Sequence, residues 1–271
     1  MSENVTQPQG FEPGVDWTPP MPPTDLIFDD GEPLETHRHR IAMNVLIASA
    51  HGALTGREDY FTGGNMFVYF SSEQARNRDF RGPDFFVVLD VDPNRERQGW
   101  VVWEEGGRYP DVIVELTSGS TAREDYGRKK EIYERVFRTR DYFVYHPFDS
   151  QSLQGWHLGG RGYEELPRGD RGWLWCDTLG VWLGVEEGTV QRETAPWLRL
   201  FRPDGSLILL PEEEAQREHQ RAEAERQRAE AERQRAEAEH RRAEMERQRA
   251  EAALAEVERL KAQLGQEPGG G

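Results

Sequence analysis

Acidic residues occur inside two strand-like runs of the sequence. The runs 84–91 and 111–117 each begin with an aspartate that follows a proline, and the second reads Asp-Val-Ile-Val-Glu-Leu-Thr. Side chains alternate along a strand, so Glu115 shares a face with Ile113 in a run that is otherwise apolar. A buried carboxylate is costly unless it is paired or bound to a metal. We therefore expect Glu115 to pair with a buried Lys or Arg, or to hold a metal ion.

A lysine lies on the inward side of the helix expected over 122–137. The apolar residues of this segment repeat at helical spacing and are Ile132, Tyr133, Val136 and Phe137. Lys129 lies three, four and seven residues before the first three of them, so it shares their face. Such a lysine either extends its stem over apolar surface to reach water, or meets the carboxylate of the preceding strand. The presence of Glu115 favours the second interpretation.

Two carboxylates and a lysine around one point suit the hydrolysis of phosphodiesters. Asp84 and Glu115 offer the oxygen ligands that Mg²⁺ prefers, and the ion keeps waters and accepts phosphate oxygen. A bound divalent ion lowers the pKa of a water ligand and polarises the phosphoryl oxygen. The ammonium of Lys129 would orient the attacking water or stabilise charge that develops at phosphorus.

The elements that must position these residues alternate between helix and strand. Periodicity and turn residues predict helices over 36–54 and 122–137, strands over 66–71, 84–91, 111–117 and 142–145, and a charged hairpin-like insertion at 92–108. Gly63-Gly64 and Gly106-Gly107 are expected in turns. The rest of the sequence to residue 210 indicates short strands and turns, a β-rich annex. The pattern predicts an α/β domain over 26–210.

Four motifs, at these spacings, resemble the Uma2 family, which belongs to the PD-(D/E)XK, restriction-endonuclease-like superfamily. The resemblance covers roughly residues 26–210, and its motifs are Arg81-Gly-Pro-Asp84, Tyr109-Pro-Asp-Val-Ile-Val-Glu115-Leu-Thr-Ser118, Asp125-Tyr-Gly-Arg-Lys129-Lys-Glu-Ile-Tyr133 and Tyr142-Phe-Val-Tyr-His-Pro147. It implies a mixed sheet flanked by helices. The sequence pattern adds the β-rich annex and a long C-terminal helix or coiled coil, which lies outside the resemblance.

The resemblance also implies roles for individual residues. Asp84 and Glu115 match the metal-binding acids, with the backbone carbonyl of Leu116 as a further ligand of Mg²⁺ or Mn²⁺. The usual lysine two positions after the glutamate is absent, since Thr117 stands there, and Lys129 matches the lysine that such proteins carry on the following helix.

Two further features bear on the implied site. Glu35 and His39 match acidic and histidine positions near the first helix, where they could reach the metal or serve in capping and packing. Gly119 replaces the proline of the family's Ser-Pro-Ser-Thr turn, which loosens that turn.

Composition separates three further regions from the domain. Residues 1–25 are rich in proline and poor in apolar groups, which predicts disorder, and 266–271 form a flexible tail. No apolar run at the start resembles a signal peptide, and none reaches the ~18 residues of a membrane span. The single cysteine, Cys176, excludes an internal disulfide and fits a reducing, cytoplasmic setting.

The region 211–265 is expected to form a charged heptad-repeat helix. The unit Gln-Arg-Ala-Glu-Ala-Glu-Arg begins at Gln220 and closely recurs at Gln227 and Gln234. A strict seven-residue repeat favours a left-handed coiled coil, and residues 220–264 are a candidate homo-oligomerisation segment. One seam of such a coil would run through Ala222, Ala229, Ala236, Ala243 and Ala250. However, the positions that should pack with it hold the glutamates Glu225, Glu232, Glu239 and Glu246 for most of its length. A solvated helix supported by Glu–Arg pairs one turn apart is an equal alternative.

The sequence therefore predicts a divalent-metal-dependent endonuclease that hydrolyses DNA. The formal net charge of −16 argues against a passive nucleic-acid coat protein, which needs a basic footprint. It does not exclude an enzyme whose metal ions restore phosphate affinity locally. The alternative is a catalytically relaxed binding module that assembles through the C-terminal helix, and the acidic surface and Gly119 favour it.

Overall fold

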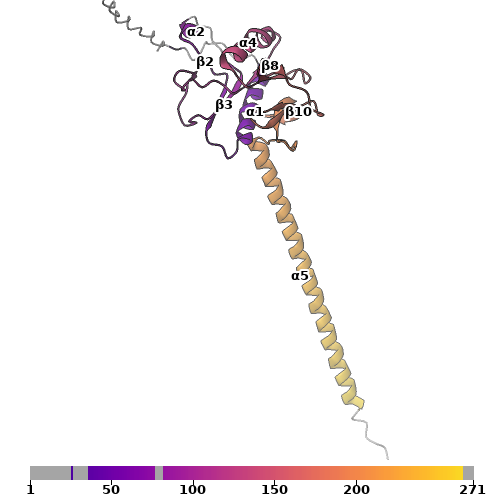
Figure 1. The fold of residues 1–271 in the computed structure, drawn as a ribbon. Coiled ribbons are helices and arrows are strands. Elements are labelled where there is room, and N and C mark those ends of the chain that lie inside the picture. Colours follow the sequence, from indigo (N-terminus) through magenta and orange to yellow (C-terminus); the bar gives the residue numbers. More distant parts are fainter. Residues whose placement is uncertain (1–25, 27–35, 77–81, 265–271) are drawn as a thin grey trace, which may run out of the picture. The chain divides into compact units, whose positions relative to one another are not determined.

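The computed structural model of the 271-residue chain describes residues 26, 36–76 and 82–264 (Figure 1). The chain divides into two units, Met1–Ile208 and Leu209–Gly271. The segment 1–25, expected to be disordered, and the expected flexible tail at 266–271 lie outside the described residues.

A six-stranded mixed sheet forms the centre of the first unit. Its order is β1-β3-β5-β6-β7-β8, and only β5 and β6 pair in parallel. The strands are β1 (Tyr60–Gly64), β3 (Phe85–Leu89), β5 (Val112–Leu116), β6 (Asp141–Tyr145), β7 (Gln154–Gly159) and β8 (Gly162–Glu165). The mixed α/β class expected from the sequence is confirmed.

Helices pack on the sheet from two parts of the sequence. Helix α1 (His37–Ala53) begins after Thr36, whose hydroxyl accepts a hydrogen bond from the backbone of His39 at 3.1 Å, a standard N-cap. The second is a continuous helical run that connects parallel strands β5 and β6. It alternates α-helical and π-helical turns: α3 (Ala122–Glu124), η1 (Asp125–Lys129), α4 (Lys130–Ile132) and η2 (Tyr133–Phe137).

The core lies against both faces of the sheet. One cluster joins alternate residues of β3, β5 and β6 to the helical run, and includes Phe86, Ile113, Tyr133, Phe137 and Tyr142. The intervening residues of these strands are buried as well, and α1 packs against β1, β3, β5 and β11. Strands covered on both faces are uniformly apolar, so a glutamate among them stands out.

The expected β-rich annex is present, but some of its strands join the central sheet and others are longer than expected. Strands β7 and β8 extend the central sheet by antiparallel pairing, which local turn signals do not reveal. A separate antiparallel sheet has the order β11-β10-β9, and two of its strands are long. These strands are β9 (Leu174–Cys176), β10 (Val181–Val190) and β11 (Glu193–Phe201).

The insertion at 92–108 connects β3 to β5, which pair antiparallel as a hairpin requires. It also contains the short strand β4 (Trp100–Val101), which pairs in parallel with β2 (Val68–Tyr69) ahead of the short helix α2 (Ser72–Arg76).

The expectation of a turn at Gly63-Gly64 is wrong, because both glycines lie in β1. A Cβ on Gly63 would lie 2.3 Å from the ring of Phe86, and one on Gly64 would lie 2.8 Å from Ile47. These glycines therefore permit close packing of the edge strand. Gly106 and Gly107 do adopt the positive φ of a turn.

The second unit contains one helix, α5 (Pro211–Leu264), of 54 residues. Its described side chains are almost all exposed, and salt bridges between residues three or four apart recur along it. A long C-terminal helix is thus confirmed. Within the described part of the chain, no helix is both long and apolar enough to cross a membrane.

Candidate active site

Asp84 and Glu115 lie together at one end of the central sheet. Phe85 of β3 pairs with Val114 of β5, so one further step of this antiparallel register places Asp84 opposite Glu115. The backbone N–H of Asp84 donates to Glu115 Oε2 at 3.3 Å. In return, the N–H of Leu116 donates to Asp84 Oδ2 at 2.8 Å. The strand pairing therefore fixes both carboxylates.

Lys129 reaches the same point from the helical run, as expected from its spacing. Its Nζ lies 3.2 Å from Glu115 Oε2 and 2.8 Å from Asp125 Oδ1. The side chains of Glu115 and Asp125 are 0% and 1% exposed, whereas that of Lys129 is 18% exposed. The ammonium thus links two buried carboxylates and retains access to solvent.

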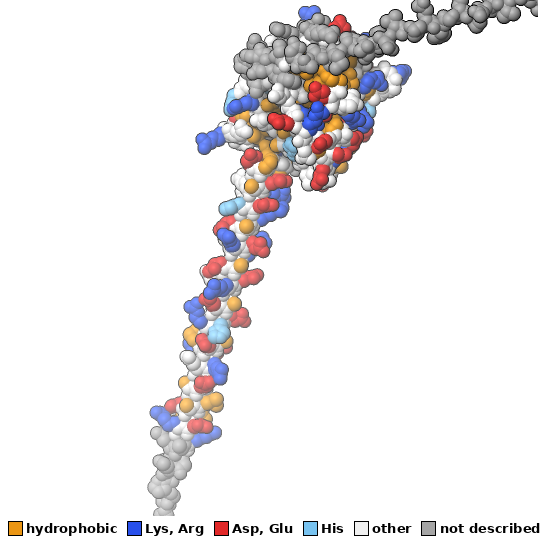
Figure 2. Space-filling model, turned by 90° about the vertical axis from the view of Figure 1, so that its left-hand side faces the viewer, with side chains coloured by type: hydrophobic (Ala, Val, Ile, Leu, Met, Phe, Trp, Pro, Cys, Tyr) orange, Lys and Arg blue, Asp and Glu red, His pale blue; other side chains and the backbone are white. Residues whose placement is uncertain are grey.

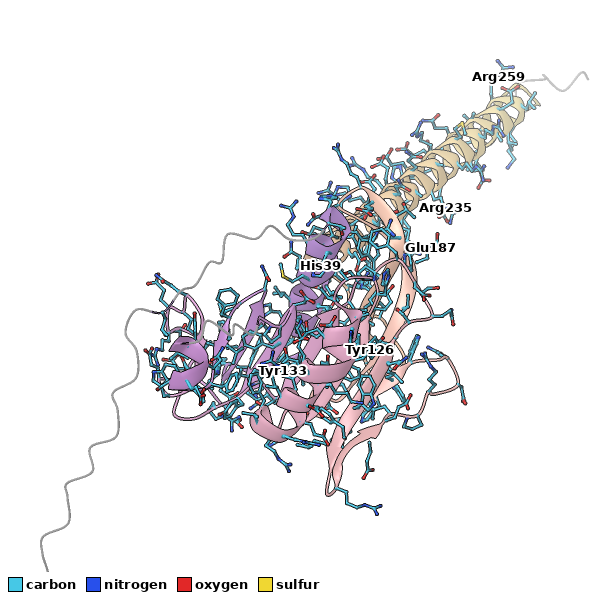
Figure 3. All side chains as sticks on the ribbon, turned by 90° about the horizontal axis from the view of Figure 1, so that it is seen from above. His39, Tyr126, Tyr133, Glu187, Arg235 and Arg259 are labelled. Atoms are coloured by element: carbon cyan, nitrogen blue, oxygen red, sulfur yellow. The ribbon has the colours of Figure 1, made fainter. Side chains whose placement is uncertain are left out.

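The π-helical turns explain why Lys129 shares its face with two residues that the sequence reasoning did not place in the site. Asp125, Lys129 and Tyr133 lie four residues apart, a period longer than the 3.6 of an α-helix, and π-helical turns keep such residues in line. Tyr133 (Figure 3) donates its hydroxyl to Glu115 Oε1 at 2.7 Å. The assignment of Val136 to the inward stripe is wrong, because Val136 is 43% exposed.

The carboxylates of the site outnumber its nearby cations. Burial raises the pKa of Glu115 to about 8, and the charges of Asp84 and Asp125 add to this, although Lys129 and Tyr133 act in the opposite direction. Burial also disfavours the charged form of Lys129, but the surrounding carboxylates outweigh it and raise the lysine pKa. The site is therefore short of positive charge around Glu115.

His39, on α1 (Figure 3), lies beside Asp84 in this site. Its Nε2 lies 2.8 Å from Asp84 Oδ1, and its side chain is 7% exposed. Burial works against the charged form of Asp84, but the hydrogen bond and charge of His39 lower the pKa of Asp84 overall, with help from Lys129. The capping and accessory roles considered for Glu35 fall on a residue outside the described part of the chain.

The turn after β5 is held by hydroxyl groups. Ser118 Oγ lies 2.8 Å from Ser120 Oγ, and the N–H of Ser118 donates to Thr121 Oγ1 at 3.0 Å. No atom within 4 Å would meet a Cβ on Gly119. Hydrogen bonds among the residues on either side of Gly119 thus bridge this turn.

Comparison with known protein families yields a match over the part of the chain that contains these residues. The model of the Uma2 family, described as "Putative restriction endonuclease", matches residues 20–191. The chain belongs to the Uma2 family. This match includes Asp84, Glu115, Lys129 and the residues that contact them, and it classes the chain with restriction-endonuclease-like nucleases.

Among solved structures, the Uma2 chain is similar to one described as a "putative nuclease belonging to DUF820" from Anabaena variabilis. The two share 12% sequence identity over 56% of this chain and 81% of that one, with a TM-score of 0.40. No curated protein matches the chain.

Restriction-endonuclease-like nucleases generally use divalent metals, and the donor set of this Uma2 site fits such an ion. Mg²⁺ is commonly held by one or two carboxylates, with water and substrate phosphate completing its shell. Asp84 and Glu115 supply two adjacent carboxylates, and the burial that raises the pKa of Glu115 disfavours its charged form unless a cation lies beside it. Among the described residues, no group of three or more His, Cys, Asp or Glu side chains is arranged to hold a metal.

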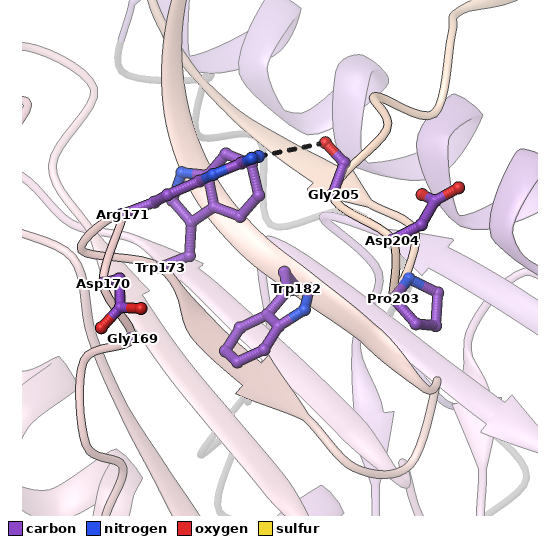
Figure 4. A pocket seen from close by; sticks show the side chains of 8 residues that line it. All are labelled: Gly169, Asp170, Arg171, Trp173, Trp182, Pro203, Asp204 and Gly205. Atoms are coloured by element: carbon purple, nitrogen blue, oxygen red, sulfur yellow. Dashed lines mark hydrogen bonds between the residues drawn. The ribbon is translucent and has the colours of Figure 1, made fainter.

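A cavity of about 340 Å³ lies elsewhere, beside the three-stranded sheet (Figure 4). The guanidinium of Arg171 lies 4.8 Å from the ring centroid of Trp173 and donates to the carbonyl of Gly205 at 3.4 Å. The remaining lining residues are Gly169, Asp170, Trp182, Pro203 and Asp204. None of the residues expected to do chemistry lines it.

Proposed function

We propose that this Uma2 protein is a divalent-metal-dependent endonuclease that hydrolyses DNA phosphodiester bonds. The observation that supports the proposal best is the approach of Lys129 Nζ to within 3.2 Å of the fully buried Glu115 carboxylate. Burial of ionisable groups with strongly shifted pKa values is typical of catalytic sites. If this buried cluster served stability alone, apolar residues of similar volume could replace it with little loss of stability.

Each residue has a distinct part in the proposal. Asp84, Glu115 and the backbone carbonyl of Leu116 would hold Mg²⁺ or Mn²⁺. When bound, the ion supplies an activated water and a Lewis acid for the phosphate. Lys129, which is partly exposed, places its ammonium where it can contact the attacking water or an equatorial phosphate oxygen.

The residues around this core fix its geometry. His39 orients Asp84 through the 2.8 Å contact, Tyr133 orients Glu115 through its hydroxyl, and Asp125 holds Lys129. Positioning by such contacts matters because small displacements of catalytic groups cost large factors in rate.

Cleavage of supercoiled plasmid with Mg²⁺ or Mn²⁺ tests the proposal. Asp84→Asn, Glu115→Gln and Lys129→Met should each lower the rate by about 10²–10⁴-fold. Lys130→Met is the matched control, because Lys130 is the next residue but its Nζ lies 3.8 Å from the ring centroid of Trp156. Its rate should stay close to that of the wild type.

The alternative function predicts a different result. A relaxed nuclease fold that only binds partners would leave plasmid, single-stranded and branched DNA intact with either metal, and would bind neither ion in calorimetry. That outcome would refute the enzyme proposal. Normal cleavage by Lys129→Met would refute the role of the lysine while leaving the metal site in place.

A further inference from the structure

Large hydrophobic side chains are exposed near the C-terminal end of α5. Leu254 is 67% exposed, and Val257 and Leu260 are each 47% exposed. Earlier in the described part of α5, Met245 is the only large hydrophobic side chain that is comparably exposed. Figure 2 shows charged side chains along the whole helix, with hydrophobic ones between them and also near its C-terminal end. Contiguous exposed apolar surface marks an interaction site.

These residues continue the seven-residue repeat in phase. With the alanine seam (Ala222, Ala229, Ala236, Ala243) taken as the first position of the heptad, Ala250 and Val257 also occupy that position, and Ala253 and Leu260 occupy the fourth. Positions one and four form the buried seam of a coiled coil. Leu254, at the fifth position, widens this seam on one side. The C-terminal heptads thus have the pattern that a second helix of the same kind can cover.

The charges beside this seam distinguish between orientations. Glu256 occupies the seventh position and Lys261 the fifth position of the next heptad. In a parallel, in-register pair the seventh position of one helix faces the following fifth position of the other, so Glu256 would face Lys261 of a second copy. In an antiparallel pair, seventh positions face seventh positions and fifth positions face fifth positions, so Glu256 would not face Lys261.

The contacts that Glu256 makes within its own helix do not compete strongly. Its Oε1 lies 3.0 Å from Arg259 Nη2, but the two side chains are 53% and 67% exposed. Pairs that exposed contribute little, so Glu256 can turn toward a neighbouring helix at little cost.

The upstream heptads do not continue the apolar seam. Their fourth position is glutamate at 225, 232, 239 and 246, and the flanking fifth and seventh positions are mostly arginine. Charged groups at the fourth position weaken a coiled coil. The apolar contact is therefore confined to the segment 250–261.

We propose that residues 250–261 form a parallel, in-register coiled-coil contact with a second copy of this chain, with Val257 and Leu260 at its centre and Glu256 facing Lys261. The partner is a second copy of this chain, because one short segment supplies both the apolar seam and the two complementary charges. It does not depend on nuclease activity.

Sedimentation equilibrium on the full chain tests the proposal. The mass should rise with concentration from 31.3 kDa toward twice that value. Leu260→Lys should keep the chain at the monomer mass over the same range. Ala255→Lys, a matched control on the side of the helix away from the seam, should associate like the wild type. Circular dichroism verifies that each variant keeps its helix.

Two further variants test orientation and register. Glu256→Lys should weaken association about tenfold or more, and the double variant Glu256→Lys with Lys261→Glu should restore it, because a parallel pair again joins opposite charges. Leu260→Cys should form an interchain disulfide, because the two copies of residue 260 face each other in a parallel, in-register pair. Cys176, the one native cysteine, is buried and should not compete.

A wild-type chain that remains monomeric to its solubility limit would overturn the proposal. So would association that Leu260→Lys leaves unchanged, because it would place the contact elsewhere. Failure of the double charge reversal to restore association would overturn the parallel arrangement. Absence of an interchain disulfide in the Leu260→Cys variant, when that variant still associates, would overturn it as well.

Discussion

The two units of this protein use the same kind of ion pair in opposite surroundings. In the globular unit, Lys129 and Asp125 lie four residues apart on a helix with their charges 2.8 Å apart and side chains 18% and 1% exposed. In α5, Arg233 and Glu237 have the same spacing at 3.2 Å, but are 75% and 50% exposed. Spacing and distance alone therefore do not distinguish a site residue from a solvated helix face.

Burial supplies the difference. Water screens the charges of α5, so each pair contributes little and its partners can be exchanged. The charges around Glu115 have lost most of their water, so each depends on its neighbours for stability. Buried charges that interact strongly with one another are therefore better candidates for a functional site than exposed ion pairs.

The largest difference should appear when one acid is removed from each pair. Asp125→Ala leaves Lys129 with one fewer buried partner and should destabilise the globular unit by about 3–5 kcal/mol. Glu237→Ala should destabilise α5 by less than about 0.5 kcal/mol. Urea unfolding followed by tryptophan fluorescence measures the first, since α5 contains no tryptophan, and circular dichroism measures the second.

Glu131→Ala is the control for the first variant, because it removes an exposed acid from the same helical run. A cost for Asp125→Ala no larger than that of Glu131→Ala would show that the buried pair has no special weight.

The next effect concerns pH. Glu115 has an ordinary pKa of 4.5 when unfolded and about 8 when folded. The native state therefore retains a proton that the unfolded chain loses, and metal-free stability should fall as pH rises through this window. The slope should approach about 1.4 kcal/mol per pH unit, or about 3 kcal/mol between pH 5 and 7.5.

Chemical denaturation in EDTA across this range measures the slope. Glu115→Gln should make the profile nearly flat, and Mg²⁺ should restore wild-type stability at high pH because it replaces the proton. A wild-type slope that persists in Glu115→Gln would assign the titration to another group.

A smaller effect is expected from a single hydroxyl. Tyr133→Phe removes the bond to Glu115 Oε1 and should cost about 2 kcal/mol, because that bond reaches a buried carboxyl group. Tyr163→Phe removes a bond to the neutral carbonyl of Thr139 at 3.0 Å and should cost about 1 kcal/mol. Equal costs in thermal unfolding would contradict a special role for Tyr133.

The sequence predicted the parts of the site that follow from local periodicity. The inward position of Glu115 follows from the alternation of a strand, and that of Lys129 from its four-residue distance to Tyr133. Both lie where they were expected, and Asp84 adjoins them because its strand pairs with that of Glu115.

The sequence did not predict what depends on departures from regular geometry. A period of 3.6 residues places Val136 inside and lets residues four apart drift around the helix, whereas the π-helical turns keep Asp125 in line with Lys129, Tyr133 and Phe137. The four-residue spacing of these residues was the available signal.

Long-range pairing was also beyond local patterns. Gly63 and Gly64 resemble turn residues, but they lie in β1, where Phe86 and Ile47 leave no room for a side chain. Strands β7 and β8 belong to the central sheet because of their pairing with β6 and with each other, and nothing in their own residues states this.

The smallest effect should come from one exposed pair of α5. Arg233→Ala removes the contact with Glu237 and should lower helix stability by about 0.3–0.5 kcal/mol. Arg235→Ala, which removes an arginine with no ion pair recorded among the described residues, controls for the change in helix propensity. Thermal melting followed at 222 nm measures both, first at low ionic strength and then in about 1 M salt, where the Debye length falls to about 3 Å. The difference between the variants should disappear in salt, because water and ions already surround the pair. A difference that survived would mean that α5 is covered by another surface, and would make its charges resemble those around Glu115.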